Sequence, residues 1–291
     1  MDTYTMGTST VHRIGFGAMQ LPGPGVMGPP RDHAEAIAVL RRAVELGVDH
    51  IDTAQFYGPD VANELIREAL HPYPDDLVIV SKVGAFRDEA GGWLPGQRPD
   101  QLRDAVEDNL RALRTEQLGA VNLRLLDHPV PGQEPVALED QLAEMVALRD
   151  EGKIAGIGIS TATLAQVQQA IETAGIVCVQ NAFSLLDQSD ADVLDLCEAR
   201  GIAYVPYFPL GSAFPGMPKV PDNPAVRAVA ERRGVTPAQV GLAWLLAHRD
   251  NILLIPGTSR LAHLEENMAV ADISLSAEDV AELEAGAVGQ G

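Results

Sequence analysis

Three polar residues with the chemistry of a proton-transfer site lie at or just beyond the ends of two short apolar runs. Asp52 ends the run that starts at His50, and Lys82 lies near the end of the run that starts at Val78. If the two runs are neighbouring parallel strands, about 4.8 Å apart, the carboxylate and the ammonium can pair at one end of a sheet. Tyr57 lies in the loop that follows Asp52, so its ring can fold back over both groups.

This arrangement suits proton donation by the phenol of Tyr57. A free tyrosine has a pKa of about 10 and is a weak acid at neutral pH. A lysine ammonium within about 4–6 Å favours the phenolate, so we expect Lys82 to lower this pKa while Asp52 keeps Lys82 charged. Tyr57 can then protonate a developing alkoxide, a contribution of roughly 10²–10⁴ in rate.

The same residues also admit a structural interpretation, in which Asp52 and Lys82 form an ion pair and Tyr57 is part of the core. Taken singly, each residue favours that interpretation. The chain has only three lysines, Lys82, Lys153 and Lys219, so a lysine at a strand end is informative. Because the two strand ends are consecutive, we favour the catalytic interpretation.

The elements that must position these residues alternate regularly between strand and helix. The apolar runs seldom alternate with polar residues, which is typical of parallel strands buried on both faces. Segments of helical length separate them; one covers Arg31–Leu46, and Asp32, Thr163 and Thr236 each precede a Glu or Gln by three positions, as a helix start does. The predicted strands are Ile14–Met19, His50–Thr53, Val78–Val83, Val121–Leu126, Ala155–Ser160, Val177–Asn181, Ala203–Tyr207 and Ile252–Ile255.

Eight strand–helix units with no change in composition predict an α/β fold, a single (β/α)₈ TIM barrel that occupies residues 1–291 as one domain. Thr3–Met6 and Thr10–His12, around Gly7, predict an N-terminal β-hairpin that plugs the bottom of the barrel. Ser276–Glu284 predicts one extra C-terminal helix. In such barrels the chemistry lies at the carboxyl ends of the strands, where Asp52 and Lys82 are expected.

Charge and composition exclude several classes of function. With 21 basic and 41 acidic residues the formal net charge is −20, which argues against nucleic-acid binding and requires a local cationic patch for any phosphorylated ligand. The sequence has neither a stretch of 18 apolar residues nor a signal-like start, so we expect a cytoplasmic protein without membrane contact. Cys178 and Cys197 are expected to be buried packing residues.

The common sequence motifs for cofactor, metal, redox and hydrolase sites are either absent or interrupted. Gly23-Pro24-Gly25-Val26-Met27-Gly28 matches a dinucleotide fingerprint, but its proline, followed by two more, forbids the strand-turn-helix that the fingerprint requires, so we expect a loop. The sequence has no His-Glu-x-x-His, Cys-x-x-Cys or Gly-x-Ser-x-Gly motif. We therefore expect no metal site, no redox dithiol and no hydrolase nucleophile.

From Ile14 to about Glu284 the sequence resembles the aldo-keto reductase family. The catalytic Asp, Tyr and Lys of that family lie in patterns that match Asp52 to Gly58 and Ser81-Lys82. The resemblance implies an NADPH cofactor. A segment similar to the NADPH segment of the family, residues 255–267, forms a turn into a helix start after the eighth strand, which favours phosphate binding. There Arg260 suits a 2′-phosphate.

The resemblance also implies a set of cofactor contacts along the barrel mouth, the end of the barrel at which the strands have their carboxyl ends. Ser160 and Gln180 match the residues that hold the carboxamide, Tyr207 matches the aromatic residue that stacks on the nicotinamide, and Glu266 with Asn267 can bond the adenine edge. The full set is Gly17, Ala18, Met19, Asp52, Ser160, Gln180, Tyr207, Pro209, Leu210, Gly211, Gly257, Thr258, Ser259, Arg260, His263, Glu266 and Asn267.

Two departures from the family pattern concern the mouth. The family usually has Ser-Asn after the fifth strand, where this chain has Ser160-Thr161. The fourth catalytic residue of the family is a histidine at the end of strand four, where this chain has Asp127, with His128 one place later. His128 can enter the site only through a local bulge, because successive strand residues point to opposite sides. Which of the two faces the substrate stays open.

These observations predict NADPH-dependent reduction of small aldehydes or ketones, with a proton from Tyr57. The expected substrate-binding residues are Asp127, His128, Phe56 and Trp93, with Phe86, Phe208 and Phe214 as further candidates. One alternative is a catalytically weak NADPH-binding regulator of the same fold. Another is an unrelated barrel enzyme with a Schiff base on Lys82.

Overall fold

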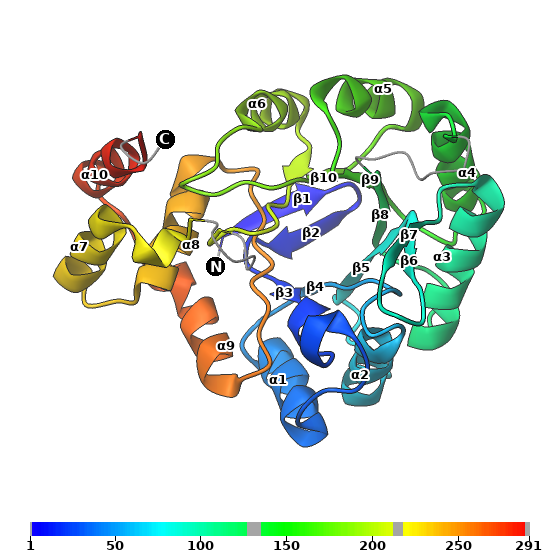
Figure 1. Ribbon diagram of the computed structural model, residues 1–291, viewed down its shortest axis with the longest axis horizontal. Helices are drawn as coiled ribbons and strands as arrows, with labels where there is room; N and C mark the ends of the chain where they lie inside the picture. Colours follow the sequence, from blue (N-terminus) through cyan, green and yellow to red (C-terminus); the bar gives the residue numbers. More distant parts are fainter. Residues whose placement is uncertain (1, 127–134, 212–217, 289–291) are drawn as a thin grey trace.

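Seven short parallel strands form one curled sheet, as Figure 1 shows. The structure, a computed structural model, describes residues 2–126, 135–211 and 218–288. The order across the sheet is β3-β4-β5-β8-β9-β10-β11, so strands follow one another as they do in the chain. These strands are β3 (Phe16–Gly17), β4 (His50–Asp52), β5 (Val78–Val83), β8 (Ala120–Arg124), β9 (Ile157–Ser160), β10 (Cys178–Gln180) and β11 (Ala203–Tyr204).

Residues 252–255 close the sheet into a barrel between β11 and β3. Ile252 forms a parallel bridge with Tyr204, and Leu254 forms one with Ile14. The backbone N–H of Gly15 donates to Leu254 O at 2.8 Å, and the N–H of Leu254 donates to Arg13 O at the same distance. The predicted eighth strand is therefore present as two isolated bridges and not as a continuous strand.

Most of the other predicted strands are also shorter in the structure, and the first and the seventh are shortened the most. The first, expected over residues 14–19, is β3 alone, because the chain turns at once into the short 3₁₀ helix Ala18–Gln20. The seventh, expected over residues 203–207, ends at Tyr204. Backbone pairing continues at Val205 and Tyr207, but Pro206 between them has no N–H to donate. Proline thus interrupts this strand.

Helices surround the sheet, and each strand leads into one of them (Figure 1). The side chains of Asp32, Thr163 and Thr236 each accept a hydrogen bond from the backbone N–H three positions later, as predicted for helix starts. These barrel helices are α1 (His33–Glu45), α2 (Val61–Leu70), α3 (Pro99–Leu113), α4 (Leu138–Asp150), α5 (Leu164–Ala174), α6 (Ala191–Arg200), α8 (Pro237–His248) and α9 (Leu261–Met268). None of the helices in the described ranges is long and apolar enough to cross a membrane.

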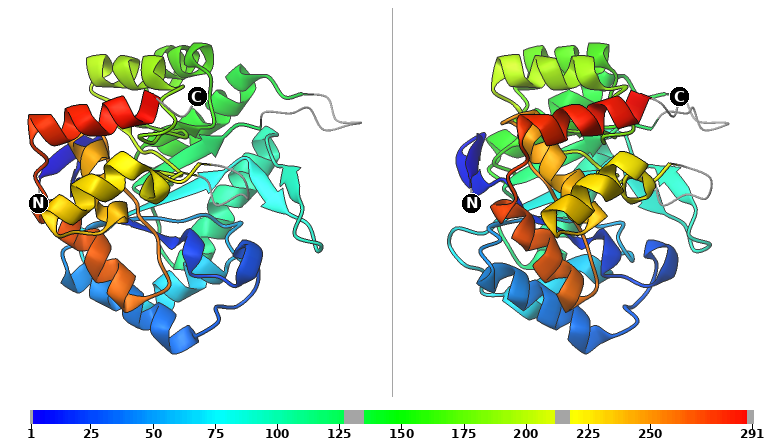
Figure 2. Two further views of the ribbon diagram at one scale, coloured as in Figure 1. Left: turned by 60° about the vertical axis from the view of Figure 1, so that its left-hand side comes forward. Right: turned by 90° about the vertical axis from the view of Figure 1, so that its left-hand side faces the viewer.

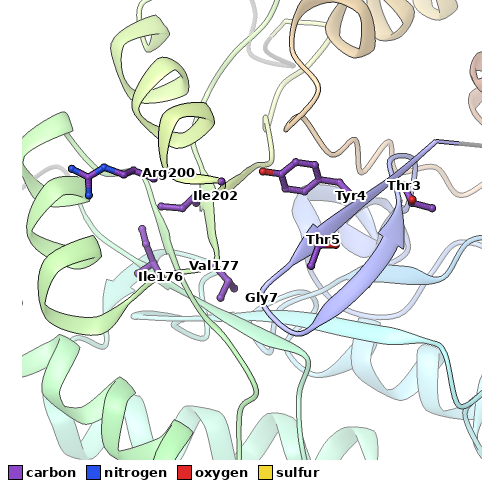
Figure 3. A pocket seen from close by; sticks show the side chains of 9 residues that line it. Thr3, Tyr4, Thr5, Gly7, Ile176, Val177, Arg200 and Ile202 are labelled. Atoms are coloured by element: carbon purple, nitrogen blue, oxygen red, sulfur yellow. The ribbon is translucent and has the colours of Figure 1, made fainter.

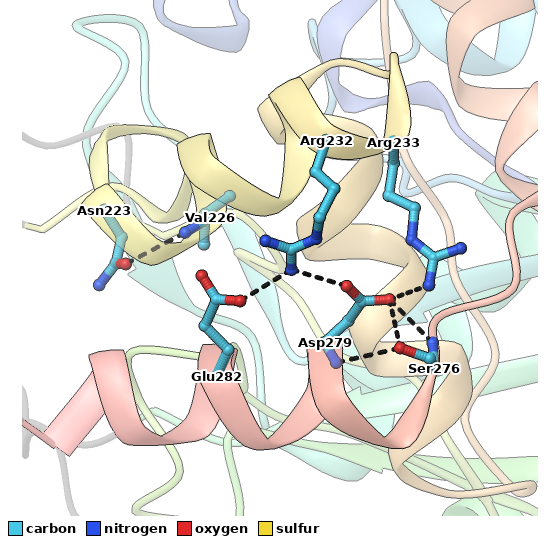
Figure 4. A network of polar contacts seen from close by, with 7 residues as sticks. All are labelled: Asn223, Val226, Arg232, Arg233, Ser276, Asp279 and Glu282. Carbon is cyan, nitrogen blue, oxygen red and sulfur yellow. Dashed lines mark hydrogen bonds and ion pairs between the residues drawn. The ribbon is translucent and has the colours of Figure 1, made fainter.

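Two additional helices, α7 (Pro224–Arg233) and α10 (Ala277–Val288), pack against each other at one side of the barrel. The carboxylate of Asp279 joins them: it accepts a hydrogen bond from Arg232 at 2.8 Å, pairs with Arg233 and bonds Ser276 (Figure 4). The predicted extra helix is confirmed as α10 and extends four residues further. The sequence analysis did not predict α7.

The amino-terminal hairpin, β1 (Thr3–Met6) and β2 (Ser9–His12), closes the bottom of the barrel as predicted. Met6 and Val11 lie in one apolar cluster with interior strand residues such as Cys178. The buried thiols of Cys178 and Cys197 have their pKa raised to about 12 by burial, so both cysteines are packing residues. That all 291 residues form one domain stays a prediction.

A second hairpin, β6 (Ala85–Arg87) and β7 (Trp93–Pro95), rises from the loop after β5. Both views of Figure 2 place this hairpin and the β1–β2 hairpin at opposite ends of the barrel. The β6–β7 hairpin therefore stands at the carboxyl ends of the strands, which is the end where the predicted catalytic residues lie.

Candidate active site

Asp52 and Lys82 meet inside the barrel at its carboxyl end. Lys82 lies two residues beyond Val80, which is part of the interior cluster, so its side chain points inward too. Its ammonium is paired with the Asp52 carboxylate and also donates a hydrogen bond to Thr53 O at 3.0 Å. Asp52 is 4% exposed and Lys82 is 5% exposed. The pair predicted from the sequence is therefore present, and it is buried.

Tyr57 covers this pair from the loop that follows β4. A turn, with the backbone N–H of Tyr57 donating to Ala54 O at 3.1 Å, brings the ring back toward the barrel. The Lys82 ammonium lies 5.0 Å from the centroid of the Tyr57 ring. The ring is buried, at 6% exposure. The structure thus brings Asp52, Tyr57 and Lys82 together.

Burial and charge act in opposite directions on the two protonated groups. Burial lowers the pKa of Lys82, but Asp52 and Tyr57 outweigh it, so the net pKa lies above the usual value and the ammonium stays charged. Burial raises the pKa of Tyr57, and the opposing effect of Lys82 is smaller. The expected net lowering of the Tyr57 pKa is therefore wrong for this structure. The phenol stays protonated at neutral pH.

Gln180 contacts the same carboxylate. Its amide N–H donates to the second oxygen of Asp52 at 2.9 Å, and the side chain is buried. Sequence reasoning assigned Gln180 to the cofactor and did not predict this bond. Asp52 is thereby held by Lys82 on one oxygen and by Gln180 on the other.

Ser160 ends β9 beside this group and is also buried. The next residue, Thr161, has a backbone φ of +59°, in the left-handed region. Asparagine adopts that conformation more readily than a β-branched residue does. The threonine noted as a departure from the family pattern therefore occupies a strained position at the mouth.

The segment after residue 255 approaches β3 very closely. A Cβ on Gly257 would lie 2.4 Å from Gly17 O, and one on Gly17 would lie 2.5 Å from Ile255 O. Only glycine fits at either position. Thr258 is buried, and its hydroxyl accepts a hydrogen bond from the backbone N–H of Arg260 at 3.1 Å.

Helix α9 begins directly after Arg260 with no side chain capping its first N–H groups. The Arg260 side chain is exposed and forms no ion pair with any residue that the structure describes. Ser259, His263 and Glu266 are also exposed, and Asn267 is half-buried. The predicted phosphate-binding and adenine-binding residues therefore share one accessible end of the barrel.

On the substrate side, Trp93 packs edge-on against Phe56, with ring centroids 5.2 Å apart, and Phe56 in turn packs edge-on against Tyr57. Trp93 is 43% exposed, whereas Phe56 is 1% exposed, so a direct substrate contact from Phe56 stays a prediction. Phe86 pairs with Leu94, while Arg87 pairs with Trp93, so Phe86 faces the other side of the hairpin.

The remaining predicted residues surround the opposite rim. Tyr207, Phe208, Pro209, Leu210 and Gly211 are half-buried after β11, and the ring of Tyr207 packs edge-on against that of Phe208. Asp127, His128 and Phe214 lie outside the described residues. Their predicted roles are therefore unchanged.

Sequence reasoning missed Arg124. This residue ends β8, two positions after Asn122, whose side chain lies inside the barrel against Cys178. Arg124 therefore points inward at the mouth, and its guanidinium carbon lies 4.7 Å from the Trp93 ring. The signal was available in the sequence, because Lys82, Asn122 and Arg124 follow the same two-residue alternation across neighbouring strands.

A separate cavity of about 540 Å³ lies at the other end of the barrel, between the β1–β2 hairpin and the end of α6 (Figure 3). Tyr4, Val177 and Arg200 are among its lining residues. None of the catalytic candidates borders it. In the described ranges no group of three or more His, Cys, Asp or Glu side chains could hold a metal ion.

Comparison with known proteins adds an independent line of support. The chain matches the model of the aldo/keto reductase family over residues 13–287. It is 48% identical over 283 residues to a pyridoxine 4-dehydrogenase of Escherichia coli, with 97% of each chain covered. The fold resembles a thermostable aldo-keto reductase in complex with the inhibitor epalrestat, at a TM-score of 0.82 and 28% identity over 98% of this chain and 100% of that one.

It also resembles an aldo/keto reductase from Klebsiella pneumoniae in complex with NADP and acetate, at a TM-score of 0.79 and 27% identity, covering 97% and 94% of the two chains. These matches confirm the (β/α)₈ barrel and the predicted class of oxidoreductase. They also confirm the resemblance, which was predicted to start at Ile14 and to extend to about Glu284. The chain belongs to the aldo/keto reductase family.

Proposed function

We propose that this protein reduces small aldehydes or ketones to alcohols with NADPH. The observation that carries the proposal is the buried Asp52–Lys82 pair beneath Tyr57 at the carboxyl end of the barrel. A buried ion pair is weak evidence for stability, because each ion loses several kcal/mol of solvation when it leaves water. Its position at the end where barrel enzymes carry their chemistry favours a catalytic role.

The three residues would divide the work of a proton transfer. NADPH, when bound, supplies the hydride for the carbonyl carbon. Tyr57 keeps its proton at neutral pH and donates it to the carbonyl oxygen as negative charge develops there. The Lys82 ammonium stabilises the phenolate that remains. Asp52 keeps Lys82 charged and holds it in place, and Gln180 fixes the second oxygen of that carboxylate.

The residues of the mouth fit NADPH. The chain after residue 255 passes so close to β3 that only glycine fits at Gly17 and Gly257. Glycine also lets the backbone come close to a ligand. The uncapped start of α9 offers N–H groups to a phosphate, and Arg260 is free to bind the 2′-phosphate. His263, Glu266 and Asn267 would border the adenine, and Ser160 with Gln180 the carboxamide.

Residues 207–211 and the turn after β3 would complete the cofactor site. Tyr207 would stack on the nicotinamide, and Pro209, Leu210 and Gly211 would follow along the cofactor. Gly17, Ala18 and Met19 would contact it from the first strand end, with Thr258 and Ser259 at the phosphate. Two solved relatives from Klebsiella pneumoniae contain NADP or NADPH, which supports this choice of cofactor.

The test is consumption of NADPH with a panel of aldehydes, run beside NADPH binding followed by fluorescence. Pyridoxal belongs in the panel, because the Escherichia coli relative is named for the oxidation of pyridoxine. Tyr57→Phe should lower turnover by about 10²–10⁴ and keep the affinity for NADPH. Tyr73→Phe is the matched control, since Tyr73 donates its hydroxyl to Leu113 O away from the mouth.

Turnover of Tyr57→Phe close to that of the wild-type protein would remove Tyr57 from the mechanism. If the protein binds NADPH but reduces none of the aldehydes, the result would favour a catalytically weak NADPH-binding regulator over a reductase. If borohydride links the aldehyde covalently to the protein in the absence of NADPH, the result would favour an enzyme that forms a Schiff base on Lys82.

A further inference from the structure

Arg124 differs from the other arginines near the mouth. Arg87 lies 4.4 Å from the same Trp93 ring, but it donates hydrogen bonds to Gly91 O and Gly25 O. The Arg124 guanidinium forms no hydrogen bond or ion pair with any residue in the described parts of the chain, and its Nε atom is buried without a partner. A buried donor without an acceptor is destabilising, and an anionic acceptor would remove that cost.

Arg124 lies near Tyr57 and far from the residues that are proposed to bind the cofactor phosphates. Its charge is one of those that lower the pKa of Tyr57, so the guanidinium lies near the phenol. In the ring of strands, β8 is separated from residues 252–255 by β3, β4 and β5 on one side and by β9, β10 and β11 on the other. Arg124 is therefore across the barrel from Arg260 and α9.

The backbone of Arg124 is held closely by the chain that follows β5. Gly84, directly after β5, has a left-handed φ of +102°, which glycine adopts without strain. A Cβ there would lie 2.4 Å from Arg124 O. Trp93 covers one face of the half-buried Arg124 side chain from the β6–β7 hairpin. A guanidinium partly removed from water binds an anion more strongly than a fully exposed one does.

We propose that Arg124 binds an anionic group of the substrate, so the protein prefers carbonyl compounds that carry a carboxylate or another anion near the reacting carbon. This inference rests on the proposed reductase function and names its substrate class. A guanidinium offers two parallel N–H donors, which match the two oxygens of a carboxylate. The protein as a whole has a net charge of −20 and repels anions, so such a substrate needs a local cation of this kind.

The experiment compares the three isomers of carboxybenzaldehyde with their methyl esters, which keep the shape and lose the charge. For at least one isomer the wild-type protein should show kcat/KM about ten- to a hundredfold higher for the acid than for the ester. Arg124→Gln should reduce this ratio to about one, mainly through a higher KM for the acid. Arg124→Lys should keep part of the preference, because it retains the charge and loses the fork.

Arg87→Gln is the matched control. It removes a second cation from the same Trp93 ring, but the guanidinium of Arg87 already donates hydrogen bonds to backbone oxygens. Its acid-to-ester ratio should stay within about threefold of the wild-type value. Unchanged NADPH affinity in each variant will show that the mouth is folded. An acid preference that is absent in the wild type, that survives Arg124→Gln, or that Arg87→Gln abolishes equally would overturn the proposal.

The outcome also separates this inference from the proposed function. Turnover of the esters, without preference for the acids, would leave the reductase function intact and remove the anion site. Failure to reduce any aldehyde with NADPH would remove both.

Discussion

The two ends of the barrel interior are built from opposite kinds of side chain. At the bottom, Met6 and Val11 of the hairpin pack against Ala203 and other small apolar residues. At the mouth, the interior positions are Asp52, Lys82 and, at the end of β8, Arg124. Two strands supply both layers: Val80 and Lys82 are two residues apart on β5, and Ala120 and Arg124 are four residues apart on β8. The apolar layer therefore lies at the end that the hairpin closes, and the charged layer lies at the carboxyl ends of the strands.

The charged layer depends on the pairing of its ions, whereas the apolar layer depends on how well its side chains fill the available volume. Removing one member of a buried ion pair leaves an uncompensated charge, which costs about 3–5 kcal/mol. Removing apolar atoms leaves a cavity whose cost depends on how far the site collapses. Variants at the two ends should therefore fail in different ways.

The largest effect is expected at the mouth. Lys82→Met should lower the free energy of unfolding by about 3–5 kcal/mol, because it leaves Asp52 buried without its partner. It should also lower kcat/KM by at least about 10²-fold. The double variant Asp52→Asn with Lys82→Met should regain most of the stability and none of the activity. Urea unfolding and steady-state kinetics provide the two measurements. A cost below about 1 kcal/mol for the single variant would mean that water reaches the pair.

A smaller effect is expected at the bottom. Met6→Ala should lower the free energy of unfolding by about 2–5 kcal/mol, because Met6 is buried beneath the hairpin. It should leave kcat/KM within about threefold of the wild-type value, since the change is confined to the other end. Leu261→Ala is a control for the loss of an apolar side chain, because Leu261 is 37% exposed. Lost activity at full stability would contradict the separation of the two ends.

The smallest effect is expected at the α7–α10 contact, which lies outside both ends. The Arg232 and Arg233 guanidiniums and Ser276 hold the pKa of Asp279 well below its usual range. The stability that this gives is present above the unfolded pKa of about 4 and is lost as the pH falls toward the folded value. Asp279→Asn should therefore cost about 1 kcal/mol or less at neutral pH. The difference between the two proteins should shrink near pH 3, and a constant difference would show that charge is not responsible.

Much of this architecture could be predicted because local signals and burial agree. Asp32, Thr163 and Thr236 mark helix starts by chemistry that acts within three residues. The pairing of Asp52 with Lys82 follows from strand adjacency alone. The helix α7 also had such a signal, since Asn223 accepts hydrogen bonds from the N–H groups of Ala225 and Val226, but its weak apolar pattern concealed it.

The parts that could not be predicted depend on contacts between distant residues. The bond from Gln180 to Asp52 joins residues far apart in the chain, and no local pattern indicates it. The direction of the Tyr57 pKa depends on how completely the ring is buried, which a spacing rule does not give. The inward position of Arg124 required the register of β8 against β5.

The seam that closes the barrel joins the first strand to the last. Arg13 donates hydrogen bonds to Ile252 O and Leu246 O, partners that lie more than 200 positions later in the chain. At a synthesis rate of about 5–20 residues per second, the two sides of this seam are made roughly 10–50 s apart. During that interval β3 is an open edge with unpaired N–H and C=O groups, which can pair with another chain. A chain that ends before residue 252 therefore has an open sheet with an exposed and aggregation-prone edge.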